Sequence, residues 1–137
     1  MNKHMVSKGN QFGRIIYFIL LSVFFLTVVT QFFLAGLAIF VDPINWSRHT
    51  TLIHLVGFNI PLFLLLFAFI GKLPQWAYWN IFGLLVGVFG MYFTANITAS
   101  IRWLGALHPV LAILLFIISY QGIKKTIKLM FIKKGEE

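Results

Sequence analysis

Two histidines, His54 and His108, are the residues of this chain best suited to hold a cofactor. Each lies about one or two helical turns below the start of an apolar stretch. If both stretches are helices that run in the same direction on diagonal corners of a bundle, the two imidazoles lie at equal depth and face each other. Imidazoles are ligands by which proteins hold the iron of haem b, one on each face of the ring. The pair therefore predicts a haem site.

Two arginines and two small residues support the same site. Haem carries two propionates that favour cations, and Arg48 and Arg102 shortly precede the two histidines. Gly57 and Ala112 follow the histidines by about one helical turn and leave room for a flat macrocycle. We therefore expect Arg48 and Arg102 to lie near the propionates.

Other roles for the histidines are open from the sequence alone. They could hydrogen-bond to each other or to an asparagine, or bind a quinone. A bare metal ion needs a third ligand, for which His49 in the expected outer loop is available, and three neutral imidazoles suit zinc or copper. Met91 is expected at a similar depth, as an axial ligand or as core filling. Pro109 either begins the last helix and leaves His108 in a loop, or kinks a helix that starts near Ser100.

Two amides form a second polar pair. Gln31 and Asn59 lie about nine residues below the outer ends of the first two apolar stretches, or roughly 13 Å at the helical rise. Lipid cannot hydrogen-bond an amide, so both side chains are expected to point into the bundle. We predict that Gln31 and Asn59 hydrogen-bond to each other between adjacent helices.

Four long apolar stretches carry these residues. A helix rises ~1.5 Å per residue and needs ~20 residues to cross a ~30 Å hydrocarbon core. The chain has 137 residues, of which 60% are hydrophobic and 10% charged, so lipid must cover most of its surface. We expect one all-α domain over residues 1–137, a transmembrane four-helix bundle with up-down-up-down topology, because short connections make neighbouring spans antiparallel. The expected spans are about 15–40, 52–70, 76–97 and 104–123.

The positive charge predicts an orientation. Nine of the eleven Lys and Arg residues fall on the side that both termini share, and the other side carries only Arg48 and Arg102. The positive-inside rule places both termini in the cytoplasm, and this distribution argues against nucleic acid as a partner. We expect residues 1–14 to be frayed. The basic tail 124–137 is expected either to lie on the anionic inner leaflet as an amphipathic helix or to extend the last span.

Gly83, Gly87 and Gly90 give the third span a face of small residues, against which another helix packs closely. This face supports a hypothesis of a different class, in which the chain is a cofactor-free accessory or scaffold protein. Such a protein packs against a larger membrane complex or a second copy of itself. The sequence has no phosphate-binding loop, no carboxylate pair, no nucleophile beside a base and no cysteine. We therefore expect no catalytic activity of its own.

Three short motifs resemble a known group of proteins. Gln31-Phe32-Phe33-Leu34-Ala35-Gly36, His54 with Gly57, and Leu107-His108-Pro109 together resemble a family of small four-span bacterial membrane proteins of unknown function. The resemblance implies a four-helix bundle in a bacterial plasma membrane and implies no activity. The similarity to four-helix b-type cytochromes is one of architecture. Our first functional hypothesis is a small membrane protein that binds one haem b near its outer face, for electron transfer or haem handling.

Overall fold

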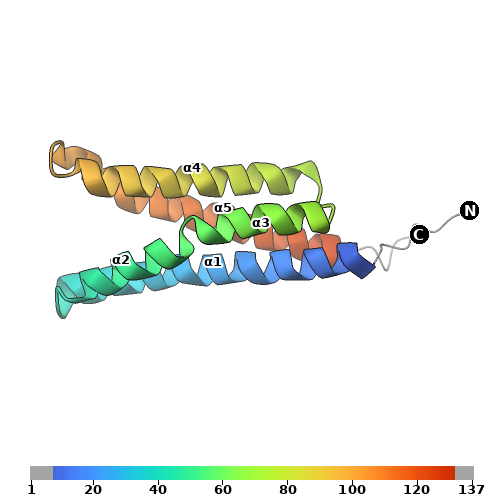
Figure 1. Ribbon diagram of the computed structural model, residues 1–137. Helices are drawn as coiled ribbons and strands as arrows, with labels where there is room; N and C mark the ends of the chain where they lie inside the picture. Colours follow the sequence, from blue (N-terminus) through green and yellow to red (C-terminus); the bar gives the residue numbers. More distant parts are fainter. Residues whose placement is uncertain (1–7, 132–137) are drawn as a thin grey trace, which may run out of the picture.

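The protein is a bundle of long apolar helices. The computed structural model describes residues 8–131, and these contain no strand. The elements are α1 (Lys8–Phe40), α2 (Asn45–Val56), α3 (Asn59–Ile70), α4 (Gln75–Ile97), the short 3₁₀ helix η1 (Arg102–Ala106) and α5 (Leu107–Phe131). Helices α2 and α3 follow one another along a single rod, so the rods run alternately up and down (Figure 1). The expected all-α four-helix bundle is confirmed.

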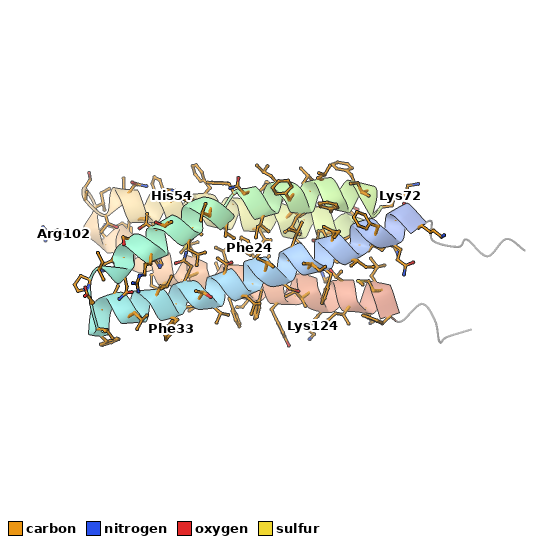
Figure 2. All side chains as sticks on the ribbon, turned by 60° about the horizontal axis from the view of Figure 1, so that its bottom comes forward. Phe24, Phe33, His54, Lys72, Arg102 and Lys124 are labelled. Atoms are coloured by element: carbon orange, nitrogen blue, oxygen red, sulfur yellow. The ribbon has the colours of Figure 1, made fainter. Side chains whose placement is uncertain are left out.

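The two ends of the bundle, called the inner and the outer end, differ in charge. The inner end holds the start of α1, the α3–α4 connection and the end of α5, and Figure 2 shows Lys72 and Lys124 near it. The outer end holds the α1–α2 connection and the segment between α4 and α5, where Arg102 lies. Within residues 8–131, Lys and Arg are therefore concentrated at the inner end.

Each rod is long and apolar enough to cross a membrane. The candidate spans are Lys8–Phe40, Asn45–Ile70, Gln75–Ile97 and Arg102–Phe131. Large apolar side chains lie exposed along them, among them Phe33 and Phe89, of which 66% and 65% are exposed. An exposed apolar surface of this extent is stable against lipid and not against water, so the chain is a multi-pass membrane protein.

The best-packed part of the core lies in the inner half of the bundle. Side chains from different helices are at most 2% exposed there and fill the space between the rods: Tyr17, Leu21, Phe24, Leu64, Ala68, Ala77, Ile81, Leu84, Leu115, Ser119 and Thr126. Such complete burial means that these rods touch along their inner halves. The inner half therefore has a continuous packed interior.

Two glycines close the inner end. Gly13 of α1 and Gly71, which follows α3, are both buried, and a side chain on Gly13 would collide with the backbone of Gly71. Arg14 Nε donates a hydrogen bond to the Gly71 carbonyl oxygen at 3.1 Å. Lys72 takes the left-handed turn conformation, with φ of 44°. The expected fraying of residues 1–14 is thus wrong for residues 8–14, which form the first turns of α1, and residues 1–7 lie outside the described part.

The glycine face of α4 is used inside the bundle. A Cβ atom added at Gly83, Gly87 or Gly90 would meet a side chain of α5, at 3.4 Å from Ile118 Cδ1, 2.6 Å from Leu115 Cδ2 and 3.0 Å from Leu111 Cδ1 respectively. The expected close packing on this face is confirmed, and its partner is α5 of the same chain. The face is therefore not free to bind a larger complex or a second copy.

The rod formed by α2 and α3 is interrupted at Gly57 and Phe58. Pro61 explains the interruption, because a proline has no N–H to donate to the carbonyl four residues earlier, that of Gly57, and its ring crowds that carbonyl. Beyond the break, α2 packs on α1, and no Cα atom of α2 lies within 8 Å of a Cα atom of α4 or α5. In Figure 1 the pair α1–α2 separates from the pair α4–α5 toward the outer end. The bundle is closed at its inner end and open at its outer end.

Helix α5 continues without a break to Phe131. Gly122 and Thr126 are buried on its inward side, and Lys125 Nζ lies 5.6 Å from the centre of the Trp76 ring. Of the two expectations for the tail, the extension of the last span therefore describes residues 124–131. Residues 132–137 lie outside the described part.

Candidate functional site

A cavity of about 600 Å³ lies at the outer end, between the α1–α2 pair and the α4–α5 pair. Its polar lining consists of His49, His54, His108, Gln31, Trp46, Thr50, Tyr92, Thr94, Asn96, Thr98 and Arg102, and Ile53, Met91, Ala95, Gly105 and Pro109 complete it. Ligand and cofactor pockets in proteins commonly have volumes of ~300–1,000 Å³. The separation of the helix pairs thus creates a space of cofactor size with an unusual number of polar groups for a membrane span.

His108 faces His49 across this cavity, and not His54 as the sequence predicts. The centres of the His49 and His108 rings are 6.5 Å apart, and their planes are inclined by 46°. His49 lies inside α2, because α2 begins at Asn45, whereas the sequence places it in a loop. Each residue turns a helix by about 100°, so His49 and His54 point in directions about 140° apart. Only one of them can face α5.

The hydrogen bonds around His108 bear on which ring nitrogen carries the proton. Thr94 Oγ1 lies 2.8 and 3.1 Å from the carbonyl oxygens of Gly90 and Met91, to which it can donate. The same oxygen lies 3.0 Å from His108 Nδ1. When Thr94 donates to a carbonyl oxygen, His108 Nδ1 is the donor to Thr94, which leaves Nε2 unprotonated in the neutral ring. An imidazole whose Nδ1–H is held in this way is oriented to bind a metal through Nε2.

On the opposite wall, Gln31 is tied to the backbone next to His49. Gln31 Nε2 donates to the His49 carbonyl oxygen at 3.0 Å, and Trp46 packs edge-on against the His49 ring with centres 5.5 Å apart. Gln31 Oε1 and His49 Nδ1 are both buried and have no hydrogen-bond partner among residues 8–131. Buried polar atoms are almost always paired, so these two atoms mark a place where a ligand or water belongs.

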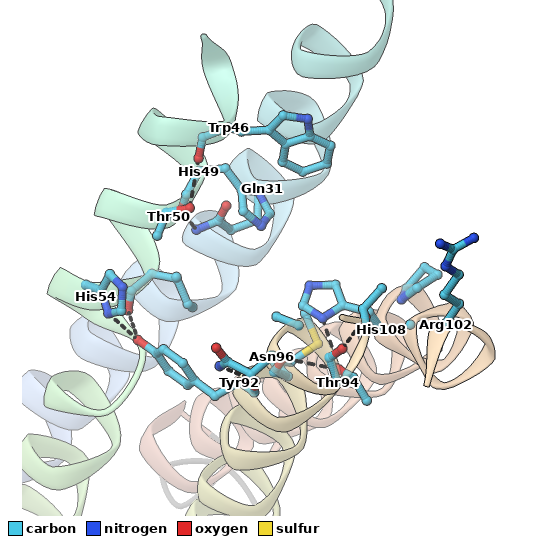
Figure 3. A pocket seen from close by; sticks show the side chains of 16 residues that line it. Gln31, Trp46, His49, Thr50, His54, Tyr92, Thr94, Asn96, Arg102 and His108 are labelled. Carbon is cyan, nitrogen blue, oxygen red and sulfur yellow. Dashed lines mark hydrogen bonds between the residues drawn. The ribbon is translucent and has the colours of Figure 1, made fainter. Parts of the chain in front are cut away.

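His54 lies at the side of the cavity, where α2 faces α4. Tyr92 Oη is 2.9 Å from His54 Nδ1 and 3.4 Å from the Ile53 carbonyl oxygen. The His54 side chain is exposed, and its ring and that of Tyr92 have centres 5.4 Å apart. Figure 3 shows His54 and Tyr92 meeting across the gap, apart from His49 and His108.

The remaining predicted site residues divide between the cavity and the surface. Arg102 and Met91 line the cavity, whereas Arg48 is not among the lining residues and donates from Nη1 to Asn45 Oδ1 at 3.0 Å. Asn59 is exposed, and its Nδ2 donates to the Leu55 carbonyl oxygen at 2.8 Å. Gln31 and Asn59 therefore do not form the predicted pair. Asn59 lies just after the break at Gly57 and Phe58, which turns it away from α1.

The side chains favour a two-ligand site over a bare metal site. Among residues 8–131 no three His, Cys, Asp or Glu side chains are grouped closely enough to hold a metal ion. The three-imidazole zinc or copper site considered from the sequence therefore lacks its ligand set in this part of the chain. Sequence reasoning missed Tyr92 and Thr94, because tyrosine and threonine are common in membrane helices. Tyr92 and Thr94 are two residues apart in α4, so their side chains lie on different sides of this helix.

Comparison with known proteins extends this picture. The sequence model of a family of unknown function, DUF6220, matches residues 31–99, which is half of the chain. The chain belongs to DUF6220. The matched part contains Gln31, His49, His54, Tyr92 and Thr94, whereas His108 lies beyond it. No curated protein and no solved structure matches the chain. Membership of DUF6220 confirms the resemblance to a family of unknown function, and the structure adds the four apolar helices.

Proposed function

We propose that this protein binds one haem b in the outer cavity, with His49 and His108 as the axial ligands. The observation that carries the proposal is the approach of these two rings from separate helix pairs, with centres 6.5 Å apart. Two imidazoles on one metal ion hold their ring centres about 6 Å apart, because each metal–nitrogen bond is about 2 Å long and each nitrogen lies about 1 Å from its ring centre. The spacing therefore suits a shared iron.

Three further features support this assignment. The cavity has a volume suited to a cofactor, and Thr94 leaves His108 Nε2 free as a ligand. Arg102 lines the cavity and would hold a propionate, the role expected of it from the sequence. Arg48 is engaged with Asn45 and is less suited to that role. The proposed ligand pair therefore contains His49 in place of His54, the ligand predicted from the sequence.

The iron of a bound haem would supply one-electron transfer. The chain's own residues would orient the axial imidazoles, hold a propionate and exclude water. Because the cavity lies in the outer half, one haem would exchange electrons with a donor in the membrane and a partner outside it. It would not carry electrons across the bilayer. Haem handling is the second use that this location allows.

The location follows from charge. Lys8, Arg14, Lys72, Lys124, Lys125 and Lys128 belong to the inner end, whereas Arg48 and Arg102 belong to the outer end. By the positive-inside rule the inner end faces the cytoplasm, so both termini are cytoplasmic in a bacterial plasma membrane. The same lysines would contact the anionic inner leaflet.

The test is a reduced-minus-oxidised absorption spectrum of the protein purified in detergent with haem supplied. We expect the bands of a low-spin b-type haem, lost in His49→Ala and in His108→Ala. Asn59→Ala changes an exposed residue outside the cavity and serves as the matched control, with the spectrum retained. His54→Ala separates the two ligand assignments, since a spectrum lost there and kept in His49→Ala would restore the pair predicted from the sequence. A protein that stays colourless with haem supplied would refute haem binding.

A further inference from the structure

The pair His54–Tyr92 joins two helices that do not pack on each other. No Cα atom of α2 lies within 8 Å of one in α4, yet Tyr92 Oη reaches His54 Nδ1 at 2.9 Å. His54 lies nine residues from the start of α2, and Tyr92 five residues from the end of α4. At the helical rise these positions are about 14 and 8 Å below the outer ends of their helices.

This depth makes the exposed imidazole of His54 unusual. Its Nδ1 is engaged by Tyr92, and the other ring nitrogen, Nε2, has no hydrogen-bond partner within the part of the chain that the structure describes. His54 lies inside the candidate span Asn45–Ile70, and a polar side chain exposed on a membrane span marks a functional position by default. A partner for Nε2 has to be soluble in the membrane and carry a hydrogen-bonding group.

The hydrogen bonds of Tyr92 allow His54 to present either a donor or an acceptor to such a partner. If Tyr92 donates to His54 Nδ1, the proton of the neutral imidazole is on Nε2, which is then a donor. If Tyr92 donates instead to the Ile53 carbonyl oxygen, 3.4 Å away, His54 Nδ1 donates to Tyr92 Oη, and Nε2 becomes an acceptor. Rotation of one hydroxyl switches the exposed nitrogen between its two roles.

A flat ring with oxygen atoms fits this arrangement. Phe58 stacks on Tyr92 from outside the cavity lining, with ring centres 5.3 Å apart and planes inclined by 13°, and the cavity itself is lined by the aromatic rings of Tyr92 and Trp46. Aromatic faces bind flat aromatic ligands by stacking. A quinone carbonyl accepts a hydrogen bond and a quinol hydroxyl donates one, which matches the two states of His54 Nε2. A phospholipid phosphate is a charged acceptor only, and it would require a cation that this pair does not supply.

We propose that His54 and Tyr92 bind the headgroup of a membrane quinone, in both its oxidised and its reduced form. The isoprenoid tail would leave between α2 and α4 into the lipid. Neither residue is a haem ligand in the function proposed above, so this site stands without the haem. If both are present, the quinol is the membrane-dissolved electron donor that a haem in this cavity requires.

The test uses the haem-free protein in lipid nanodiscs, with decylubiquinone and its quinol as probes. Quinones quench indole fluorescence, and Trp46 lines the cavity, so binding is followed by quenching that is lost in Trp46→Phe. We expect saturable binding of both forms. His54→Ala should raise Kd about tenfold, which corresponds to about 1.4 kcal/mol. Tyr92→Phe keeps the stacking ring and should raise Kd roughly threefold to tenfold through the lost hydrogen bond.

Two variants make the result specific. Tyr78→Phe removes a tyrosine hydroxyl from the other end of α4 and should leave both Kd values unchanged. His54→Gln keeps a polar side chain and should restore most of the affinity that His54→Ala loses, which separates binding from misfolding. Quenching that is not saturable, or a Kd unaffected by His54→Ala and Tyr92→Phe, would overturn the proposal. Displacement of the probe by phosphatidylglycerol at equal membrane concentration would assign the pair to a lipid headgroup and overturn it as well. Repeating the titration with haem-loaded protein keeps failure of the haem site distinct from failure of this one.

Discussion

Replacement of Thr94 by valine tests whether this residue fixes the orientation of His108. Thr94 is 3% exposed, and valine matches its shape while removing the hydroxyl. The change deprives His108 Nδ1 of an acceptor at 3.0 Å. Hydrogen bonds between membrane helices contribute on average ~0.6 and at most ~1.7 kcal/mol, less than the full penalty of an unpaired buried group, because side chains in the unfolded state also find partners in lipid. We expect Thr94→Val to lower the free energy of unfolding by an amount within that range.

A double-mutant cycle isolates this contact. Thr94→Val, His108→Ala and the double variant are unfolded reversibly in mixed detergent, and their free energies of unfolding are compared. The coupling between the two sites should be ~0.6–1.7 kcal/mol. Thr126→Val is the matched control, because Thr126 is fully buried and donates only to the Gly122 carbonyl oxygen at 2.8 Å. That carbonyl keeps its helical partner, so little stability should be lost.

The same variant tests the proposed haem site. Loss of a group that orients a metal-binding histidine typically lowers metal affinity about 10–100-fold. Haem affinity of Thr94→Val should fall in this range while that of Thr126→Val stays unchanged, as measured by titration of the haem-free protein. A coupling energy indistinguishable from zero, below about 0.3 kcal/mol, would refute the hydrogen bond between Thr94 and His108.

Two other predictions concern packing and orientation. Gly13→Ala should destabilise the protein by about 1–3 kcal/mol, because the added methyl group meets the backbone of Gly71. Gly36→Ala adds a methyl group that meets nothing within 4 Å, so it should be neutral or stabilise the protein by up to ~1 kcal/mol. Equal unfolding free energies for the two variants would contradict this prediction. Because the chain contains no cysteine, a single introduced cysteine can be labelled selectively. Lys72→Cys should react with a membrane-impermeant maleimide only in inside-out vesicles, and Trp103→Cys should react only in intact cells. The reverse pattern would invert the topology.

The spans and the bundle could be predicted from sequence because they depend on local properties. A run of about 20 apolar residues has few stable alternatives to a membrane helix, and short connections fix the up-down order. The glycine spacing in α4 was also informative, since the residues on that face are set by helical periodicity alone. The neighbour that covers this face could not be predicted, because small residues can pack against any helix. Here α5 takes the place expected for an external partner.

The ligand pair could not be predicted because it depends on where one helix begins. An apolar run starting at Leu52 leaves His49 in a loop, yet the polar segment from Asn45 is helical and brings His49 into the bundle. Once both histidines are on α2, helical geometry separates their directions. The signal that sequence reasoning overlooked was Pro61, whose position predicts an interruption near Gly57. The size and direction of the resulting separation depend on packing between distant helices.

The closed inner end gives the outer cavity a floor. Gly13 packs against Gly71, and Tyr17, Leu64 and Ile81 above them are at most 1% exposed. All the residues that line the cavity belong to the outer halves of the helices or to the segment between α4 and α5. A ligand therefore has to enter and leave the cavity at the outer end.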